Sequence, residues 1–356
     1  MKNILLFSQK LVSWYAVNQR NLPWRDTNDP YRIWISEIIL QQTRIVQGIE
    51  YYNRFVRRFP DVRSLAEASE REVLKYWQGL GYYSRARNLH TAAQSIVNEY
   101  GGKFPHRYED VLRLKGIGEY TAAAIVSFAW NQPYPVVDGN VYRFLSRLFA
   151  IGEPIDTAKG KKYFTELAAE LMDRSQAGVF NQAIMEFGAL QCVPSLPDCN
   201  VCPFRDECLA CSHHTISHYP VKQNKTQTKS RYLYYFHIHD KKHLYLKQRQ
   251  DKGIWQNLFE FPLIESEKAL SFDEIIQAFS SKKWLPDGLI SDFRLRIENR
   301  KHVLSHRILY ANFYELELKH LPDAPNELIR IAHTAIDDYP VHRLMQFYLE
   351  KNSRFV

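Results

Sequence analysis

The sequence predicts two domains, a mainly helical part over residues 1–211 and a smaller α+β part over residues 231–356. Up to residue 211, apolar residues recur at three- and four-residue spacing, which is typical of helices. After residue 231, aromatic and β-branched residues alternate with polar ones, which is typical of strands. A third observation is that four of the five cysteines lie between residues 192 and 208. Such crowding indicates a metal-binding or disulfide-bonded loop at the end of the helical part.

Length and composition fit a soluble protein of two domains. A single core stops growing at roughly 250–300 residues, so a chain of 356 residues is expected to hold two. The apolar run near the N-terminus, Ile4 to Phe7, is too short for a signal peptide. No stretch approaches the roughly 20 apolar residues of a membrane span. We therefore expect no membrane association and a cytoplasmic location, or a nuclear one if the protein is eukaryotic.

The helices of the first part are predicted by apolar periodicity and by the turn residues between them. Asn28-Asp29-Pro30, Phe59-Pro60-Asp61, Gly101-Gly102 and Gln132-Pro133 punctuate the chain. The spacing predicts helical segments at Leu6–Trp14, Ile33–Leu40, Val73–Trp77, Ala86–Val97, Thr121–Phe128 and Phe180–Leu190.

The cysteine spacing, C-x6-C-x2-C-x5-C over Cys192, Cys199, Cys202 and Cys208, favours an iron–sulfur cluster. Disulfides are one alternative, but a chain of this length without signs of secretion does not need such bridges. Zinc is another, but four-cysteine zinc sites usually contain two C-x2-C pairs, and only Cys199 and Cys202 form one. Chance clustering of the cysteines is the third alternative. We predict one 4Fe–4S cluster held by these four thiolates.

The second part of the chain is predicted to follow a basic linker at residues 212–230. No acidic residue lies between Glu207 and Asp240, which together with the net charge of +8 favours a polyanionic partner. A solvated linker without a partner is the alternative. The pattern predicts strands at 231–239, 243–249, 293–297 and 308–318, a turn at 240–242, and helices at 271–280 and 340–350.

A glycine-bracketed turn from Leu114 to Thr121 connects two predicted helices. The helix–turn–helix unit is expected at about residues 112–126. Gly116 and Gly118 can take positive φ and let another backbone approach closely. The free N–H groups of such a turn, at a helix N-terminus, form an anion site of phosphate size. Taken alone, the turn is explained more often by a plain helix–helix connection.

The turn, an aspartate eighteen residues after Tyr120 and the cysteine loop follow one another in the order found in the helix-hairpin-helix DNA glycosylase superfamily, which the chain resembles. Further motifs narrow the resemblance to adenine DNA glycosylases of the MutY type. The resemblance covers the whole helical part and, more loosely, the C-terminal part. These motifs are Leu22-Pro23-Trp24-Arg25, Trp34-Ile35-Ser36-Glu37, Leu40-Gln41-Gln42-Thr43 and the run from Gly79 to Arg87.

The resemblance implies a pair of catalytic carboxylates. Glu37, on an otherwise apolar helix where burial would raise its pKa, matches the acid that protonates adenine and then helps water attack. Asp138 matches the carboxylate that faces the cationic sugar, by charge alone or by a transient bond. A helix N-cap is the structural alternative for Asp138, and both roles are compatible. Tyr120 and Asn140 are expected to support the pair. Lyase relatives carry at position 120 a lysine that forms a Schiff base, so Tyr120 predicts base removal alone.

The resemblance also implies which residues hold the DNA. A base can be reached only after it has left the stack. For Trp24, one of the residues expected around it, packing in the core is the alternative role. Residues expected around the extruded adenine are Leu22, Trp24, Arg25 and Gln182.

Other residues are expected along the duplex. Gln41 and Tyr82 match residues that wedge into the base stack, with packing under the neighbouring glycines as the alternative for Tyr82. Gln42 shares the motif of Gln41, and Gly116 and Gly118 are expected at the DNA backbone.

The C-terminal part resembles a Nudix fold through the segment from Gly253 to Pro262. No Nudix catalytic signature follows that segment, so we expect no pyrophosphohydrolase activity. In the family this domain checks the partner base, and Leu304-Ser305-His306 stands in place of a Phe-Ser-His loop. Ser305 and His306 keep the hydrogen-bonding groups that reading 8-oxoguanine needs, whereas Leu304 lacks the aromatic ring. The alternative is that Ser305 and His306 are ordinary turn residues.

The cysteine loop also departs from the family. Relatives often carry Lys or Arg between the first two cysteines for phosphate contact, but residues 193–198 contain no cation. This departure from the family indicates a cluster that is structural more than electrostatic. The family's spacing favours Cys208 over Cys211 as the fourth ligand.

We predict a monofunctional glycosylase of base excision repair that hydrolyses the N-glycosidic bond of adenine opposite 8-oxoguanine or guanine. Its partner would be double-stranded DNA with such a mispair, and we expect a monomer, associated with the nucleoid. One alternative is an endonuclease III-like glycosylase/lyase for pyrimidine lesions, against which Tyr120 and the additional C-terminal domain argue. The other is a catalytically silent protein that binds DNA damage, against which the presence of both Glu37 and Asp138 argues.

Overall fold

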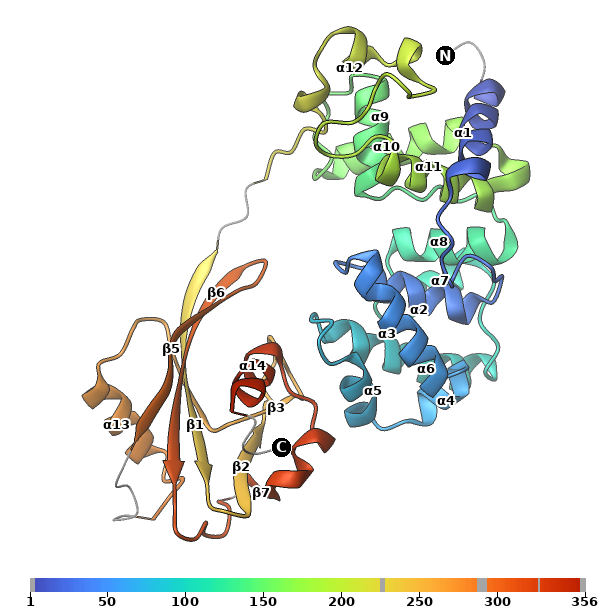
Figure 1. Cartoon of the computed structure of the whole chain (residues 1–356). Coiled ribbons are helices and arrows are strands. Elements are labelled where there is room, and N and C mark those ends of the chain that lie inside the picture. Colours follow the sequence, from blue (N-terminus) through green and yellow to red (C-terminus); the bar gives the residue numbers. More distant parts are fainter. Residues whose placement is uncertain (1–3, 225–227, 287–292, 326, 353–356) are drawn as a thin grey trace. The chain divides into compact units, whose positions relative to one another are not determined.

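The computed structural model describes residues 4–224, 228–286, 293–325 and 327–352. The chain forms two compact units (Figure 1). Unit 1 comprises Met1–Glu67 with Thr91–Lys225, and unit 2 comprises Ala68–His90 with Thr226–Val356. A helical segment, residues 68–90, therefore belongs by its contacts to the unit that contains the C-terminal part. The boundaries at residues 211 and 231 rest on composition and stay a prediction.

Unit 1 contains only helices and their connections among the residues that the structure describes. Each helical segment predicted from the periodicity is present in the chain and extends beyond the predicted bounds at one or both ends. The helices outside unit 2 are α1 (Ile4–Asn18), α2 (Pro30–Leu40), α3 (Ile45–Arg58), α4 (Val62–Glu67), α6 (Ser84–Tyr100, which continues from unit 2), α7 (Tyr108–Arg113), α8 (Glu119–Trp130), α9 (Gly139–Leu148), α10 (Ala158–Leu171), α11 (Ala177–Leu190) and α12 (Leu209–Ser212), with 3-10 turns at Arg174–Gln176, Arg205–Glu207 and Ile216–His218.

One core of unit 1 forms where α1, α9, α10 and α11 meet, and its centre is aromatic. The rings of Phe144 and Phe187 lie 4.5 Å apart, and Phe204 lies 5.4 Å and 5.2 Å from them. Cys192 and Cys208 pack against the same core. The cysteine loop is thus anchored on α9 and α11.

Helix α2 is buried on almost all sides because it is apolar around its whole circumference. Asp29 caps its first turn by accepting a hydrogen bond from the Tyr31 backbone N–H (3.0 Å), and Pro30 occupies the first helical position. The helix packs against α8. A polar side chain in the middle of α2 is therefore held in the interior of the unit.

The predicted hairpin is formed by α7, a turn and α8. Gly116 adopts φ +81°, which confirms the expected left-handed turn. Gly118 does not: its φ is −100°, and an added Cβ would meet no atom within 4 Å. Neither strain nor crowding therefore requires glycine at 118, where the residue serves as the N-cap of α8.

Unit 2 is built around a seven-stranded mixed sheet with the strand order β3-β2-β1-β6-β5, in which β4 pairs with β1 and β7 with β2. The four predicted strands are confirmed as β1, β2, β5 and β6, whereas the sequence does not predict the three shorter ones. β1 and β6 pair in parallel, from Lys229 with Arg307 to His239 with Glu317. The strands are β1 (Lys229–His239), β2 (His243–Gln248), β3 (Phe259–Glu260), β4 (Leu263–Ser266), β5 (Arg294–Val303), β6 (Arg307–Glu317) and β7 (Ile329–Ala332).

Different helices cover the two faces of this sheet (Figure 1). On one face, Phe236 of β1 packs against Phe279 of α13, with ring centroids 4.7 Å apart. On the other, Tyr348 of α14 stacks on Phe313 of β6 at 4.8 Å. Both predicted helices are confirmed. The helical elements of the unit are α5 (Glu70–Trp77), α13 (Phe272–Ser281), α14 (Arg343–Lys351), the start of α6 and a 3-10 turn at His333–Asp338.

The first half of the predicted linker is folded against unit 1. The Val221 carbonyl accepts a hydrogen bond from the Ile155 N–H (3.0 Å). The Asp156 carboxylate accepts hydrogen bonds from the backbone N–H groups of Gln223 (2.9 Å) and Asn224 (2.8 Å). Positions 225–227 of the linker lie outside the described residues.

None of the described helices combines the length and the apolar character that crossing a bilayer requires.

Candidate active site

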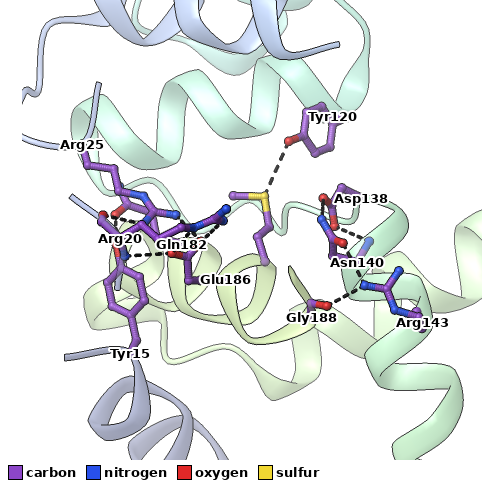
Figure 2. A network of polar contacts seen from close by, with 11 residues as sticks. Tyr15, Arg20, Arg25, Tyr120, Asp138, Asn140, Arg143, Gln182, Glu186 and Gly188 are labelled. Carbon is purple, nitrogen blue, oxygen red and sulfur yellow. Dashed lines mark hydrogen bonds and ion pairs between the residues drawn. The ribbon is translucent and has the colours of Figure 1, made fainter. Parts of the chain in front are cut away.

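A cavity of about 510 Å³ lies in unit 1 between α2, α8, α9 and α11. Its lining comes from segments more than a hundred residues apart in the chain, so the fold alone brings them together. Figure 2 shows part of the polar network around it. Residues predicted from the sequence that line this cavity are Leu22, Trp24, Arg25, Glu37, Gln41, Tyr120, Asp138, Asn140 and Gln182.

Glu37 enters the cavity from the middle of α2 and is buried, with 9% of its surface exposed. Burial is the main cause that raises its pKa, to about 7, and the nearby Asp138 carboxylate adds to the rise. A hydrogen bond from Tyr120 and the charge of Arg25 act in the opposite direction. At neutral pH a large share of Glu37 is therefore protonated and can donate a proton.

Asp138 immediately precedes α9 and caps it. One of its oxygens accepts hydrogen bonds from the backbone N–H groups of Asn140 and Val141, both at 2.8 Å. The other accepts from Nδ2 of Asn140 at 2.7 Å. Burial raises the pKa of Asp138, although these hydrogen bonds oppose the rise. The predicted N-cap is confirmed, and the same carboxylate lines the cavity that holds Glu37.

Tyr120 lies in the first turn of α8, and its hydroxyl forms a hydrogen bond to Sδ of Met185 at 3.5 Å (Figure 2). Burial raises the pKa of Tyr120 well above its ordinary value, and the carboxylate of Glu37 acts in the same direction. The hydroxyl therefore stays protonated and serves as a hydrogen-bond donor.

An ion-paired carboxylate forms another part of the cavity wall (Figure 2). Glu186 of α11 accepts hydrogen bonds from Arg25 at 2.7 and 2.9 Å and from Nε of Arg20 at 2.8 Å. Burial alone would raise its pKa, but the two arginines outweigh that effect and lower the pKa of Glu186 to about 2. The sequence analysis missed Arg20 and Glu186. Glu186 is, like Glu37, an acid within an apolar helix, and that pattern could have indicated it.

Gln182 and Trp24 are fixed by aromatic neighbours. The Tyr15 hydroxyl donates a hydrogen bond to Oε1 of Gln182 at 2.7 Å (Figure 2). The ring of Trp24 meets Tyr52 edge-on at 5.3 Å, and Trp24 is 8% exposed. Trp24 is thus a packed core residue that also lines the cavity.

Arg143, which Figure 2 shows beside Asn140 and Gly188, connects the cavity to the cysteine loop. Its guanidinium donates to Oδ1 of Asn140 (2.9 Å), to the Gly188 carbonyl (2.5 Å) and to the Cys192 carbonyl (2.8 Å). Helices α9 and α11 come so close here that a Cβ on Gly188 would lie 2.5 Å from the Asn140 carbonyl oxygen. The sequence analysis missed this arginine, since nothing in its local pattern separates it from a surface residue.

The cysteines of the loop surround a second, small cavity. Cys192, Cys199, Cys202, Cys208 and Cys211 all line it, and all five are free thiols. Burial raises the pKa of Cys199 to about 11 and that of Cys202 to about 12. Thiolates gathered this closely need a cationic centre among them, so the donor set fits a soft metal centre. The structure does not distinguish Cys208 from Cys211 as the fourth ligand, and that choice stays a prediction.

Gln41 and Gln42 follow the end of α2. The side-chain amide of Gln41 donates to the Thr121 hydroxyl at 3.4 Å and lines the cavity. Gln42 adopts φ +64° and is exposed, and it is absent from the cavity lining.

The predicted residues of unit 2 meet one another. Tyr82, at φ +46° and 47% exposed, lies with its hydroxyl 2.5 Å from Oγ of Ser305. Ser305 and His306 are exposed at the turn between β5 and β6, which the hydrogen bond from the Leu304 N–H to the Arg307 carbonyl closes at 2.8 Å. Two residues that the sequence separates by more than two hundred positions thus form one polar pair.

Comparison with known proteins gives a consistent result. Residues 35–170 match the HhH-GPD superfamily of base excision DNA repair proteins, and residues 234–351 match the NUDIX domain. The chain is 34% identical to the adenine DNA glycosylase of Buchnera aphidicola subsp. Baizongia pistaciae, over 86% of this chain and 85% of that protein. It is 43% identical to the adenine DNA glycosylase of Rattus norvegicus over 58% of this chain and 42% of the rat protein. A solved structure of a thermostable thymine-DNA glycosylase matches 60% of this chain and 98% of its own with a TM-score of 0.56 and 29% identity.

Fold and family matches define a helix-hairpin-helix protein of base excision repair that carries a C-terminal NUDIX-like domain. The chain belongs to the adenine DNA glycosylase family. It is a DNA glycosylase, a hydrolase of N-glycosyl bonds. The predicted fold class and enzyme class are confirmed.

Proposed function

We propose that this protein removes adenine from DNA in which adenine is mispaired with 8-oxoguanine or guanine, and that it leaves an abasic site without cutting the strand. The observation that carries the proposal is the pairing of two carboxylates in one cavity. Glu37 has a pKa of about 7, and Asp138 lines the same cavity. Related proteins named adenine DNA glycosylase support adenine as the base.

The chemistry assigns a separate task to each carboxylate. Protonated Glu37 donates its proton to the extruded adenine, which makes the base a better leaving group. The glycosidic electron pair leaves with the base, and positive charge develops on the sugar. Asp138 stabilises that charge, by electrostatics or by a transient bond. Ionised Glu37 then accepts a proton from the water that attacks the sugar.

Tyr120 limits the reaction to base removal. A lyase needs an amine that forms a Schiff base with the sugar, and position 120 offers a phenol that burial keeps protonated. We assign to Tyr120 and Asn140 the positioning of Glu37 and Asp138. Leu22, Trp24, Arg25 and Gln182 are assigned to the surroundings of the extruded adenine.

We assign a second set of residues to contacts with the DNA duplex. Gln41 and Tyr82 would fill the space that the extruded base leaves, with Gln42, Gly116 and Gly118 at the DNA backbone. Ser305 and His306 would read the partner base, and the contact of Ser305 with the Tyr82 hydroxyl supports a joint role. We propose that the protein acts as a monomer on chromosomal DNA.

Cys192, Cys199, Cys202 and Cys208 would hold one 4Fe–4S cluster, which fixes the loop against α9 and α11. Purified protein should then contain about four irons and four sulfides per chain. Cys199→Ser should lose them. Stoichiometric zinc without sulfide in this loop would contradict the cluster.

A cleavage assay tests the function. Duplexes with A·8-oxoguanine, A·G and A·T pairs, and one with an oxidised pyrimidine, are incubated with the enzyme and analysed with and without alkali. We expect adenine loss opposite 8-oxoguanine and guanine, with strand breaks only after alkali. Borohydride should trap little covalent adduct, and Tyr120→Lys should increase trapping. Strong trapping by the unmodified protein would indicate a lyase, and binding without base loss would indicate a silent protein.

A further inference from the structure

Two histidines and a glutamate meet in the interior of unit 2, apart from the residues assigned above. His237 and His239 are two positions apart on β1, so they face the same side of the sheet. Glu315 of β6 is the register partner of His237 in the parallel ladder and therefore shares that side. All three are buried, with exposures of 1%, 2% and 4%. The rings of the two histidines stack at 4.3 Å.

The spacing of their ligand atoms fits a small cation. One ligand atom from each of His237, His239 and Glu315 lies within 4.8 Å of the others. Nε2 of His239 lies 3.4 Å from Oε1 of Glu315. In a tetrahedral zinc site with bonds of about 2.0–2.1 Å, neighbouring ligand atoms stand about 3.3–3.4 Å apart. This pair already has that separation.

Each of the three side chains also contacts a neighbouring polar group through its other nitrogen or oxygen atom, as side chains that bind metals do. Nδ1 of His237 lies 3.1 Å from the Tyr348 hydroxyl, and Nδ1 of His239 lies 3.2 Å from the Asp240 carbonyl oxygen. Oε2 of Glu315 accepts a hydrogen bond from Nε of Arg296 at 2.7 Å. Engagement of the second nitrogen or oxygen fixes the tautomer and the direction of a ligand.

We infer that His237, His239 and Glu315 form a structural zinc site that ties β1 to β6 beneath α14. Imidazole and carboxylate ligands suit zinc, and this site would be separate from the cysteine loop and from excision chemistry. His333, whose ring lies 5.6 Å from that of His239, stands beside the set and is our candidate for the fourth position. The competing arrangement is a metal-free cluster in which His239 contacts Glu315 directly.

X-ray absorption at the zinc edge on the whole 356-residue chain distinguishes these arrangements. The protein is incubated with excess zinc sulfate, desalted, and analysed for zinc and iron by mass spectrometry. We expect about one zinc per chain with a nitrogen/oxygen shell alone at about 2.0–2.1 Å. Sulfur scatterers at about 2.3 Å would place the zinc among cysteines and overturn the inference. Failure to retain zinc would also overturn it.

Variants then locate the ion. His239→Gln should lose the zinc and keep the iron content of the unmodified protein. His320→Gln, at a histidine whose side chain is 79% exposed, is the matched control and should keep both. Zinc retained by His239→Gln with an unchanged absorption spectrum would overturn the assignment. If His239→Gln does not fold, the absorption spectrum of the unmodified protein still decides between sulfur and nitrogen/oxygen ligands.

Discussion

Glu37 and Glu186 are buried glutamates in the walls of one cavity, yet they differ in protonation. Their exposures are 9% and 1%, so burial does not explain the difference. The pKa of Glu37 is raised to about 7, whereas Arg20 and Arg25 lower that of Glu186 to about 2. The comparison teaches that the charged partners of a buried carboxylate, more than its depth, decide whether it is an acid or a fixed anion.

The two regions around these glutamates divide the work of the cavity. On the Glu186 side, one carboxylate forms ion pairs with two arginines, which holds the arginines in fixed positions. On the Glu37 side, burial and the Asp138 carboxylate outweigh the hydrogen bond from Tyr120 and the charge of Arg25, which leaves the acid close to half-protonated at neutral pH. Substitutions that remove one charge at a time should therefore have opposite consequences in the two regions.

Asp138→Asn should slow adenine release strongly. The amide keeps an acceptor for the N-cap of α9 but removes the negative charge beside Glu37. We expect the single-turnover rate of adenine release to fall by about 10²–10³-fold. Asp173→Asn changes a capping aspartate that does not line the cavity, and it should keep the rate. An Asp138→Asn enzyme with the unmodified rate would exclude Asp138 from the chemistry.

Glu186→Gln should destabilise the protein at all pH values above about 4. Removal of the carboxylate leaves Arg25 buried without its partner, which costs about 3–5 kcal/mol for a fully buried pair. Because Arg20 is partly exposed, at 32%, we expect a loss near the lower end, about 3 kcal/mol. Denaturant unfolding followed by tryptophan fluorescence measures it. Glu166→Gln, at an exposed ion pair with Lys162, should change stability by less than about 0.5 kcal/mol. Equal losses in the two variants would refute the ion-pair account.

Glu37→Gln should stabilise the protein, and only at higher pH. The folded-state pKa of about 7 lies above the ordinary value of 4.5, so folding favours the protonated form. Wild-type stability therefore falls as the pH rises from 4.5 through 7, and the glutamine variant lacks this loss. We expect an advantage of about 2–3 kcal/mol at pH 8 and none at pH 4.5. An advantage that did not depend on pH would mean that Glu37 does not ionise in the folded protein.

Tyr82→Phe should have the smallest effect. The variant keeps the ring and removes only the hydroxyl that meets Ser305, a contact worth about 0.5–1.5 kcal/mol. We expect the ratio of single-turnover rates on A·8-oxoguanine and A·G duplexes to fall by about two- to tenfold. Tyr163→Phe is the matched control, because Tyr163 is 46% exposed and lies in unit 1. If the ratio is the same in the unmodified enzyme, in Tyr82→Phe and in Tyr163→Phe, the Tyr82 hydroxyl does not take part in recognition of the partner base.

Local patterns of the sequence predicted the elements that local forces determine. Apolar periodicity located the helices. The family motif identified Glu37, and its burial could be predicted because its neighbours in α2 are apolar. Asp138 could be predicted as an N-cap because its hydrogen bonds are local and go to Asn140 and Val141, two and three residues further along the chain.

Features that depend on distant contacts could not be predicted. The pairing of Glu186 with Arg20 and Arg25 joins segments separated by more than 160 positions. The parallel ladder of β1 with β6 places Glu315 beside His237, although alternation alone gives neither partner nor direction. The positive φ expected for Gly118 is wrong. Its φ of −100° suits any residue, so the presence of a glycine did not indicate a left-handed backbone at this position.

The rate of adenine release against pH, in the unmodified enzyme and in Glu37→Gln, tests the central claim most directly. For the unmodified enzyme, kcat/KM reports the free acid and should fall above pH 7, approaching tenfold per unit, because the pKa of Glu37 is about 7. Glu37→Gln should bind the mispaired duplex with nearly unchanged affinity, release adenine about 10²–10⁴-fold more slowly, and show no decline with this pKa. If Glu37→Gln kept the unmodified rate, or kept the same decline above pH 7, Glu37 would not be the acid.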